Sequence, residues 1–415
     1  MSKVIVAGGG VIGLCTAYYL HKAGHEVTVI ERGDIKHGTS FGNAGYISPS
    51  HFIPLASPGI VAKGLKWMLS SSSPFYIKPR LDLDLIKWGL TFWRRSARST
   101  MEKNIPPLNE ILHLSRTLTS EIRNELGNHF RMEEVGCFML YKSAVTEKHE
   151  IELAKEAAAL GIETKIFDAK GVQDMEPEVQ VNVQGGVLYP IDCHLHPGDL
   201  MKTMYDHLES NGVSFQLNTT IEGFEKKGRR VTKVITDKGD FASDEIILAT
   251  GSWLPVVTKH LGIDLLLQAG KGYSMTFEKV QKNLHHPAIL VDDRVAMTPM
   301  GSDLRMGGTM EISGLQSPML MKRAQAIFKA AKNYYPNLPV TFPAADKIWW
   351  GWRPLSPDGL PYIGRNSKYD NLVLAGGHAM LGLSLAAATG KLVEEIVSGK
   401  KTSMDIQAFD VERYN

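Results

Sequence analysis

The chain has 415 residues, of which 43% are hydrophobic and 22% are charged, values typical of a soluble globular protein. The 46 Lys and Arg residues against 44 Asp and Glu residues give a net charge of +2, which excludes a dedicated nucleic-acid binder. The three cysteines, Cys15, Cys137 and Cys193, match neither a disulfide framework nor a metal motif. We therefore expect a reducing compartment, the cytoplasm.

Two apolar runs could be mistaken for targeting or membrane segments. Residues 3–7 pass directly into glycines, without a basic segment before them or a small-residue cleavage site after them, so we expect this strand to stay in the protein. Residues 372–390 carry no charge over a length close to that of a membrane span. Their glycines predict instead a strand over 371–375, a turn, and a helix over 381–398.

Along the chain, segments typical of strand–helix–strand units alternate with segments typical of antiparallel strands. Hydrophobic periodicity and turn residues predict, in chain order, helix 11–24, strand 26–31, a long loop over 39–80, helices within 82–129, strand 135–142, helix 147–160, helix 198–211, strand 213–217, a hairpin over 221–237, strand 244–249, a β-rich stretch over 271–310 and helix 318–333. Strand–helix–strand units thus interleave with antiparallel-looking strands. This order predicts an α/β protein of two discontinuous domains with a cleft between them.

A glycine motif at the N-terminus predicts a dinucleotide site. Gly8, Gly10 and Gly13 form G-x-G-x-x-G between a strand and a helix, where they allow a tight turn, approach of a pyrophosphate and close packing of the helix. The helix N-terminus offers free N–H groups to phosphates. Glu31 ends the second strand, where a carboxylate can accept hydrogen bonds from ribose hydroxyls.

NAD and FAD both fit this unit, and the rest of the chain favours FAD. Residues 246–251 and 372–377 each form a further strand that ends in a glycine turn. A large isoalloxazine ring needs such additional backbone donors at its pyrimidine end, whereas a nicotinamide cofactor does not.

Five segments in order resemble one family. The opening VIVAGGGVIGLCTAYYLHKAGHEVTVIER, the loop GTSFGNAGYISPS, and the segments IILATGSW, GWRPLSPDGLPYIG and GGHAMLGLSLA are similar to the D-amino-acid oxidase/dehydrogenase superfamily of FAD enzymes, closest to its bacterial D-amino-acid dehydrogenase branch. The resemblance implies a Rossmann-like FAD-binding domain over 1–80, 145–265 and 354–415, and an antiparallel-sheet substrate domain over 81–144 and 266–353.

The resemblance also implies which residues hold non-covalent FAD. These are Gly8, Gly10, Val11, Ile12 and Gly13 at the pyrophosphate, Glu31, Arg32 and Ile221 at the adenosine, Ser40, Asn43, Ala44, Gly45, Thr250, Gly251 and Trp253 along the flavin, and Met380, Leu381, Gly382, Leu383 and Ser384 at its pyrimidine edge.

Arg353 stands at the position of the family's substrate-carboxylate arginine, between Trp352 and Pro354. A guanidinium binds a carboxylate with two parallel hydrogen bonds, which would direct the substrate Cα–H at flavin N5. The implied reaction is oxidative deamination of a D-amino acid: hydride leaves Cα for the flavin, and the imine hydrolyses to a 2-keto acid and ammonia. Tyr273 and His51 are candidate pocket residues.

Two departures from the sarcosine-oxidase branch are informative. Gly351 stands where that branch carries the cysteine bonded to flavin, so we expect FAD without a covalent bond. Arg305 stands where it carries an oxygen-activating lysine, and a guanidinium spreads its charge more widely than an ammonium. We therefore expect electrons to pass to a quinone or another carrier rather than to oxygen.

Several alternatives stay open at this point. The substrate could instead be a secondary amine or small amino acid such as D-proline, D-hydroxyproline, sarcosine or glycine, or the chain could be a flavin-binding subunit without turnover. Residues 59–69 and 86–95 combine tryptophans with lysines and arginines, which allows peripheral contact with the inner face of a membrane. His194 and His196 lack accompanying ligands, so we expect no metal site.

Overall fold

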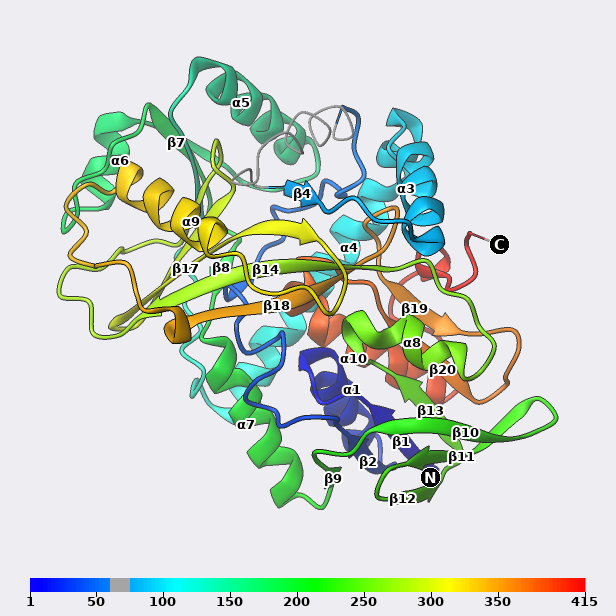
Figure 1. Ribbon diagram of the computed structural model, residues 1–415. Helices are drawn as coiled ribbons and strands as arrows, with labels where there is room; N and C mark the ends of the chain where they lie inside the picture. Colours follow the sequence, from blue (N-terminus) through cyan, green and yellow to red (C-terminus); the bar gives the residue numbers. More distant parts are fainter. Residues whose placement is uncertain (60–74, 415) are drawn as a thin grey trace.

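The computed structural model of the protein describes residues 1–59 and 75–414. Its first layer is a six-stranded sheet in the order β19-β20-β13-β1-β2-β9 (Figure 1). The strands are parallel except for the edge strand β19, and they span β1 (Lys3–Ala7), β2 (Glu26–Ile30), β9 (Ser214–Gln216), β13 (Glu245–Leu248), β19 (Tyr362–Arg365) and β20 (Leu372–Gly376). Other elements cover both faces of this sheet, which is why β1 is buried continuously from Val4 to Ala7.

Alternate residues of β1 show the two cores that this sheet separates. Val4 and Val6 pack into the core under the helices, which are α1 (Val11–Lys22), α4 (Arg98–Leu126), α7 (Pro197–Ser210) and α10 (Gly382–Val397). Ile5 and Ala7 pack on the other side, against the sheet of β10 (Ile221–Lys227), β11 (Arg230–Thr236) and β12 (Gly239–Ala242), together with α8 (Leu254–Lys259). The short helix η1 (Gly251–Trp253) lies between α8 and β18.

The second layer is a nine-stranded, mostly antiparallel sheet that crosses the molecule above the first one (Figure 1). Its order is β18-β14-β17-β16-β15-β5-β7-β6, with β4 beside β17. The bounds are β4 (Phe75–Ile77), β5 (Cys137–Tyr141), β6 (Lys165–Asp168), β7 (Gly185–Tyr189), β14 (Gln268–Phe277), β15 (Ala288–Leu290), β16 (Val295–Met300), β17 (Asp303–Ile312) and β18 (Ile348–Leu355).

Helices cover the outer side of this second sheet. The helix α9 (Met321–Tyr334) buries Ile327 against Leu304 and Met306 of β17, and α6 (Ala169–Met175) packs on the same face near β7. The helix α5 (Ala144–Ala159) packs on the opposite face, against Met139 and Val187, and its side chains reach the cavity. The remaining elements are the pair β3 (Tyr46–Ile47) and β8 (Cys193–His194), the helix α3 (Leu83–Arg95), and the short helices η2 (Ala345–Lys347) and η3 (Gln407–Phe409).

The α/β class with two sheet layers predicted from the sequence is confirmed, but two segments lie elsewhere than expected. Strands β6 and β7 fall within 145–265, which was assigned to the FAD-binding domain, yet they pair with β5 in the second sheet. Helix α4 falls within 81–144, assigned to the substrate domain, yet its apolar face packs on α10. Periodicity identifies such elements but does not reveal which sheet or helix they contact.

The uncharged run over 372–390 is strand β20 followed by a turn and α10, as predicted. None of the helices described over 1–59 and 75–414 combines the length and the apolar character needed to cross a bilayer.

Candidate active site

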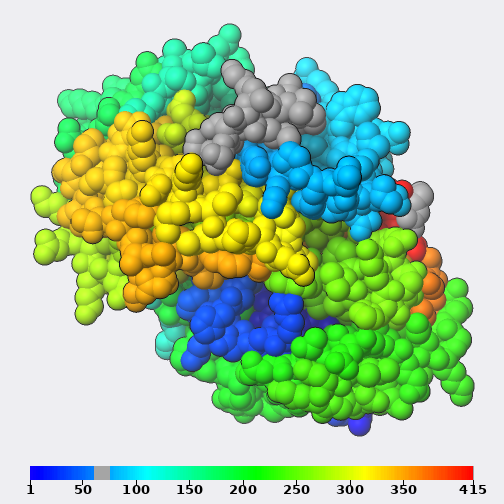
Figure 2. Space-filling view, in the orientation of Figure 1, coloured from blue at the N-terminus to red at the C-terminus, as the bar shows by residue number. Residues whose placement is uncertain are grey.

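A cavity of about 1370 Å³ lies between the two sheets. Figure 2 shows a hollow here. The blue N-terminal residues lie in it, between the yellow and orange segments above and the green segments below. The turns after β1, β13 and β20 form one side, and β14, β17 and β18 form the other. This volume exceeds that of an ordinary small-molecule pocket, so it can hold a dinucleotide together with a second ligand.

The glycine motif forms the floor of this cavity. Gly8 has φ +111°, and a Cβ there would lie 2.4 Å from the carbonyl oxygen of Ala249. A Cβ at Gly13 would lie 1.8 Å from the carbonyl oxygen of Gly8, so only glycine lets α1 start this close to β1. Gly10 precedes the first turn of α1 without a side-chain cap, which leaves the positive end of the helix facing the cavity.

Glu31 and Arg32 lie at the end of β2, beside this floor. The Glu31 carboxylate accepts hydrogen bonds from the backbone N–H groups of Gly9, at 2.6 Å, and Gly33, at 2.8 Å. The Arg32 guanidinium lies 4.1 Å from the centre of the Trp253 ring, a cation–π distance. Ile221, at the start of β10, lines the same end of the cavity.

The loop over residues 38–50 crosses the cavity and is held from several sides. Ser40 Oγ accepts a hydrogen bond from Val11 N–H, and Asn43 Oδ1 accepts one from Gly45 N–H. Thr298 Oγ1 donates to the carbonyl oxygen of Ala44 at 2.7 Å. The Trp349 indole lies against the backbone of Gly42. A Cβ at Gly42 would lie 2.1 Å from this ring, so the contact requires glycine.

The segment after β20 completes the floor. Ala379 adopts φ +49°, and its N–H donates to the carbonyl oxygen of Pro354. Leu381 precedes α10 without a side-chain cap, so the start of a second helix also faces the cavity. Ser384 Oγ donates to the carbonyl oxygen of Tyr46 and accepts from Ser48 N–H, which ties α10 to the loop.

Unpartnered polar atoms show that this cavity is shaped for a polar ligand. Thr250 Oγ1, Thr309 Oγ1 and Trp352 Nε1 are buried, line the cavity and have no hydrogen-bond partner among the residues described. Buried polar atoms normally find partners, so these three atoms mark places for ligand groups. With two helix N-termini, the glycine floor and the Glu31 carboxylate, these residues fit FAD.

Arg353 lies on the opposite wall, on β18. Its Nη1 donates to the carbonyl oxygen of Thr309 at 2.5 Å. The guanidinium fills the space beside Gly272, where a Cβ would lie 2.3 Å from Cζ. Burial lowers the pKa of Arg353 to about 10, so the group keeps its positive charge at neutral pH.

No carboxylate among the described residues forms an ion pair with Arg353, although the side chain lines the cavity and is half-buried. A desolvated guanidinium without a counter-ion favours an anionic ligand, and its planar fork matches a carboxylate. This arrangement can therefore bind the carboxylate of a small molecule beside the cofactor.

A second group of titratable side chains lines the same cavity. His51 lies near Arg294, and burial together with this charge lowers the pKa of His51 to about 4, so its imidazole is neutral. Burial raises the pKa of Glu150 on α5 to about 7, and the side chain lines the cavity. Nearby, Asp192 accepts from both the N–H and the Oγ of Ser50, and burial raises its pKa to about 7.

Most of the site residues expected from the sequence line the cavity, and four do not act as expected. Gly13 and Gly45 support close packing behind it. Tyr273 contributes to the wall, but its hydroxyl bonds to Glu311 and Leu320 on the outer side of the sheet. Arg305 is not among the lining residues, because its guanidinium donates to the carbonyl oxygens of Phe41 and Asn43 and to Thr276. This placement does not fit the catalytic role considered for Arg305, in which its charge would influence how the reduced flavin reacts with oxygen.

The two histidines considered as metal ligands have other surroundings. His194 is buried in β8, and His196 Nδ1 accepts from Asp199 N–H at the start of α7. Across the described part of the chain, no three His, Cys, Asp or Glu side chains gather as metal ligands do.

Sequence reasoning missed several residues of the site. Thr309, Glu150 and Trp349 line the cavity although no motif marks them, and Gly272 lies against the Arg353 guanidinium. In KGYS the sequence points to the tyrosine as a pocket residue, whereas the neighbouring glycine is what makes room for Arg353. A glycine within a strand signals a close approach, and this signal was available.

Comparison with known proteins agrees with this geometry. The family described as FAD dependent oxidoreductase matches residues 3–396. D-amino acid dehydrogenase of Granulibacter bethesdensis is 32% identical over 99% of both chains, and that of Bradyrhizobium diazoefficiens is 33% identical over 99% of both. Among solved structures, glycine oxidase from Geobacillus kaustophilus covers 100% of both chains with a TM-score of 0.79 at 21% identity. L-proline dehydrogenase from P. horikoshii covers 100% of this chain and 97% of its own with a TM-score of 0.78 at 18% identity.

The superfamily and the cofactor expected from the sequence are thereby confirmed. The matched family spans both sheet layers and the cavity between them. The chain belongs to the family of FAD-dependent oxidoreductases.

Proposed function

We propose that this protein oxidatively deaminates a D-amino acid and passes the electrons to a quinone or another carrier. The observation that carries the proposal is the Arg353 guanidinium, which lines the cavity without a carboxylate partner among the described residues. The relatives named D-amino acid dehydrogenase cover nearly the whole chain and support the same substrate class.

Arg353 would bind the substrate carboxylate and thereby fix the orientation of Cα. Two parallel hydrogen bonds restrain rotation as well as position, which makes one Cα–H the group presented to the cofactor. FAD, when bound, supplies the acceptor for the hydride that leaves Cα. Water then converts the free imine to a 2-keto acid and ammonia.

The other polar groups of the cavity suit a neutral substrate amine. His51 is uncharged at neutral pH because burial and Arg294 lower its pKa to about 4. Burial lowers the pKa of His378 to about 3, and its Nε2 lies 3.0 Å from Thr389 Oγ1. Two neutral imidazoles in the wall add no positive charge that would compete with Arg353 for the carboxylate.

The proposal is tested by anaerobic mixing of FAD-loaded enzyme with single D-amino acids, D-proline, D-hydroxyproline, sarcosine and glycine, while flavin absorbance is followed. We expect D-amino acids to bleach the flavin and Arg353→Met to retain FAD but lose at least about 30-fold in reduction efficiency, since such a contact contributes about 2–5 kcal/mol. Bleaching by D-proline, D-hydroxyproline or sarcosine alone would show that the substrate is a secondary amine and not a primary D-amino acid. No bleaching by any compound would favour a subunit without turnover.

The quinone proposal also rests on an exposed apolar face. On α3, Leu83, Ile86, Leu90 and Trp93 recur at helical spacing and are 48–75% exposed, next to Lys87, Arg94 and Arg95. Figure 1 shows α3 on the outside of the molecule. An apolar face beside basic residues fits the surface of an anionic bilayer, where quinones reside. Of the two segments considered from the sequence, 59–69 lies outside the described residues except for Gly59.

Vesicle sedimentation tests the membrane contact. We expect the FAD-loaded enzyme to sediment with phosphatidylcholine–phosphatidylglycerol vesicles and Trp93→Glu to reduce the bound fraction. Val145→Glu, at an apolar residue exposed on α5, is the matched control and should bind as the unmodified enzyme does. Equal binding by both variants would remove α3 from the contact.

A further inference from the structure

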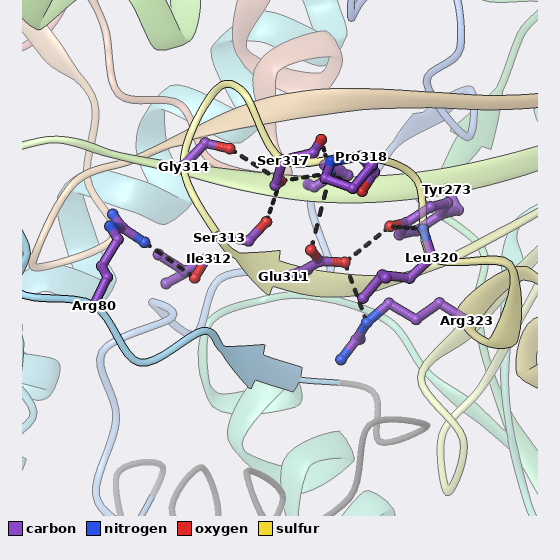
Figure 3. A network of polar contacts seen from close by, with 11 residues as sticks. Arg80, Tyr273, Glu311, Ile312, Ser313, Gly314, Ser317, Pro318, Leu320 and Arg323 are labelled. Carbon is purple, nitrogen blue, oxygen red and sulfur yellow. Dashed lines mark hydrogen bonds and ion pairs between the residues drawn. The ribbon is translucent and has the colours of Figure 1, made fainter.

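A group of charged side chains is buried behind the wall that carries Arg353. Lys271 on β14 and Arg323 on α9 are both 0% exposed, and Glu311 on β17 is 2% exposed. Glu311 Oε1 lies 3.9 Å from Lys271 Nζ, and its Oε2 lies 3.2 Å from Arg323 Nε. Figure 3 shows Glu311 between Tyr273, Arg323 and the loop of residues 313–318.

The residues on either side of Gly272, Lys271 and Tyr273, both contact the Glu311 carboxylate. Tyr273 Oη donates to Glu311 Oε2 at 2.8 Å and accepts from Leu320 N–H at 3.1 Å. Lys271 Nζ donates to the carbonyl oxygens of Ser317, at 2.6 Å, and Pro318, at 2.7 Å. Since side chains alternate across a strand, Lys271 and Tyr273 share the outer face, and Gly272 between them faces the Arg353 guanidinium.

The strand pairing is irregular at this place. Lys271 pairs with Glu311 and Tyr273 pairs with Gly308, so β17 has one residue more than β14 across this step. The extra residue forms a β-bulge, in which Thr309 adopts φ +60°, a conformation that is strained for a β-branched side chain. The bulge directs the Thr309 carbonyl oxygen at Arg353 Nη1.

We propose that Glu311 and Tyr273 are positioning residues that hold Arg353 through this bulge. The irregular step of the pairing runs from Lys271–Glu311 to Tyr273–Gly308. The hydrogen bond between Glu311 and Tyr273 joins the two strands across this step and holds Thr309 in its strained conformation. Gly272 and Thr309, which form the two sides of the guanidinium site, lie within that step. The inference rests on the proposed function, because it assigns a carboxylate-binding role to Arg353.

Stability alone gives no reason for such a network. Replacing a buried ion pair by apolar side chains of similar volume is often neutral or stabilising. The network does have a geometric consequence. The Glu311 carboxylate is shared by the Lys271 ammonium, the Tyr273 hydroxyl and the Arg323 guanidinium, and these contacts permit few arrangements of β14 and β17.

The test measures binding of propionate and of propionamide to the FAD-loaded enzyme by titration of flavin absorbance. We expect Glu311→Gln to raise the propionate Kd about 10-fold and Tyr273→Phe to raise it about 3-fold, with the propionamide Kd unchanged. Glu245→Gln, which breaks the pair of Glu245 with Arg365 at 2.8 Å in the other sheet, is the matched control and should leave both values unchanged. Tyr273→Phe keeps the test valid if Glu311→Gln does not fold.

The decisive comparison is made in the background of Arg353→Met. If Glu311 and Tyr273 act through Arg353, their substitutions should change the propionate Kd by less than about 2-fold in that background. Equal effects with and without Arg353, or parallel losses for propionate and propionamide, would overturn the positioning role while leaving the proposed function intact. Unchanged propionate binding by Arg353→Met itself would overturn the proposed carboxylate site, and the inference with it.

Discussion

The guanidinium of Arg353 occupies the space that a side chain at Gly272 would need. The two residues lie on neighbouring strands, β18 and β14, and a Cβ at Gly272 would lie 2.3 Å from Cζ and 2.4 Å from Nη2 of Arg353. Contacts this short cannot exist between non-bonded atoms, so a methyl group there would push the guanidinium away from Thr309. The glycine is therefore part of the arginine site, although it offers no functional group.

We expect Gly272→Ala to raise KM for the amino-acid substrate by about 10-fold or more, because a misplaced guanidinium loses its bidentate geometry. FAD content should stay at the level of the unmodified enzyme, as Gly272 lies on the wall opposite the glycine motif. Gly223→Ala is a suitable control, since the nearest atom to its Cβ would be 3.9 Å away. An unchanged KM in Gly272→Ala would show that the guanidinium has another productive position.

Arg305 holds the loop that crosses the cavity. Its Nη1 donates to the carbonyl oxygens of Phe41 and Asn43, at 3.1 and 2.6 Å, and its Nε donates to Thr276 Oγ1. We expect Arg305→Lys to lose part of this set, at a cost of about 1–3 kcal/mol, and to release FAD more readily. Peroxide formation per bound flavin should not change. A higher peroxide rate at full FAD content would show that the residue at position 305 does influence the reaction of reduced flavin with oxygen.

Glu31 organises two backbone N–H groups at the end of β2. We expect Glu31→Gln to raise the FAD Kd about 10-fold or more, because an amide cannot accept from Gly9 and Gly33 as a carboxylate does. Fluorescence titration of the apoenzyme with FAD measures this. Glu26→Gln, on the same strand with its exposed pair to Lys3, is the control and should bind FAD normally.

The release of flavin tests the absence of a covalent bond. The three cysteines are buried, and none is among the described residues that line the cavity. We expect acid precipitation to transfer all the flavin to the supernatant, as measured by its absorbance. Yellow colour that stays with the precipitated protein would contradict this.

The sequence predicted the floor of the site well and its opposite wall poorly. Gly8, Gly10 and Glu31 belong to one strand–helix–strand unit, so local pattern fixes their relative positions. Arg353 was found through its neighbours in the chain, but the bulge at Thr309 and the network of Glu311 depend on which strands pair. That pairing joins segments far apart in the chain, and periodicity carries no information about it. For the same reason β6 and β7 were assigned to the wrong layer.

Glu150 makes the stability of the protein depend on pH in a defined direction. Burial raises its pKa from 4.5 to about 7, so the folded state holds a proton that the unfolded chain has already released between these values. The unfolded state then binds fewer protons than the folded state, and the free energy of unfolding falls as pH rises from about 4.5 to about 7. The full penalty, up to about 3 kcal/mol, is present above pH 7.

We therefore expect Glu150→Gln to melt at a higher temperature than the unmodified enzyme at pH 8, and at nearly the same temperature at pH 5. Glutamine keeps the shape of the side chain and removes the ionisation, so the difference between the two pH values isolates the carboxyl group. Glu152→Gln is the matched control, because Glu152 is exposed on the same helix α5 and should give the same melting temperature as the unmodified enzyme at both pH values. A stabilisation of Glu150→Gln that is equal at pH 5 and pH 8 would show that repacking of the side chain, and not its charge, is responsible.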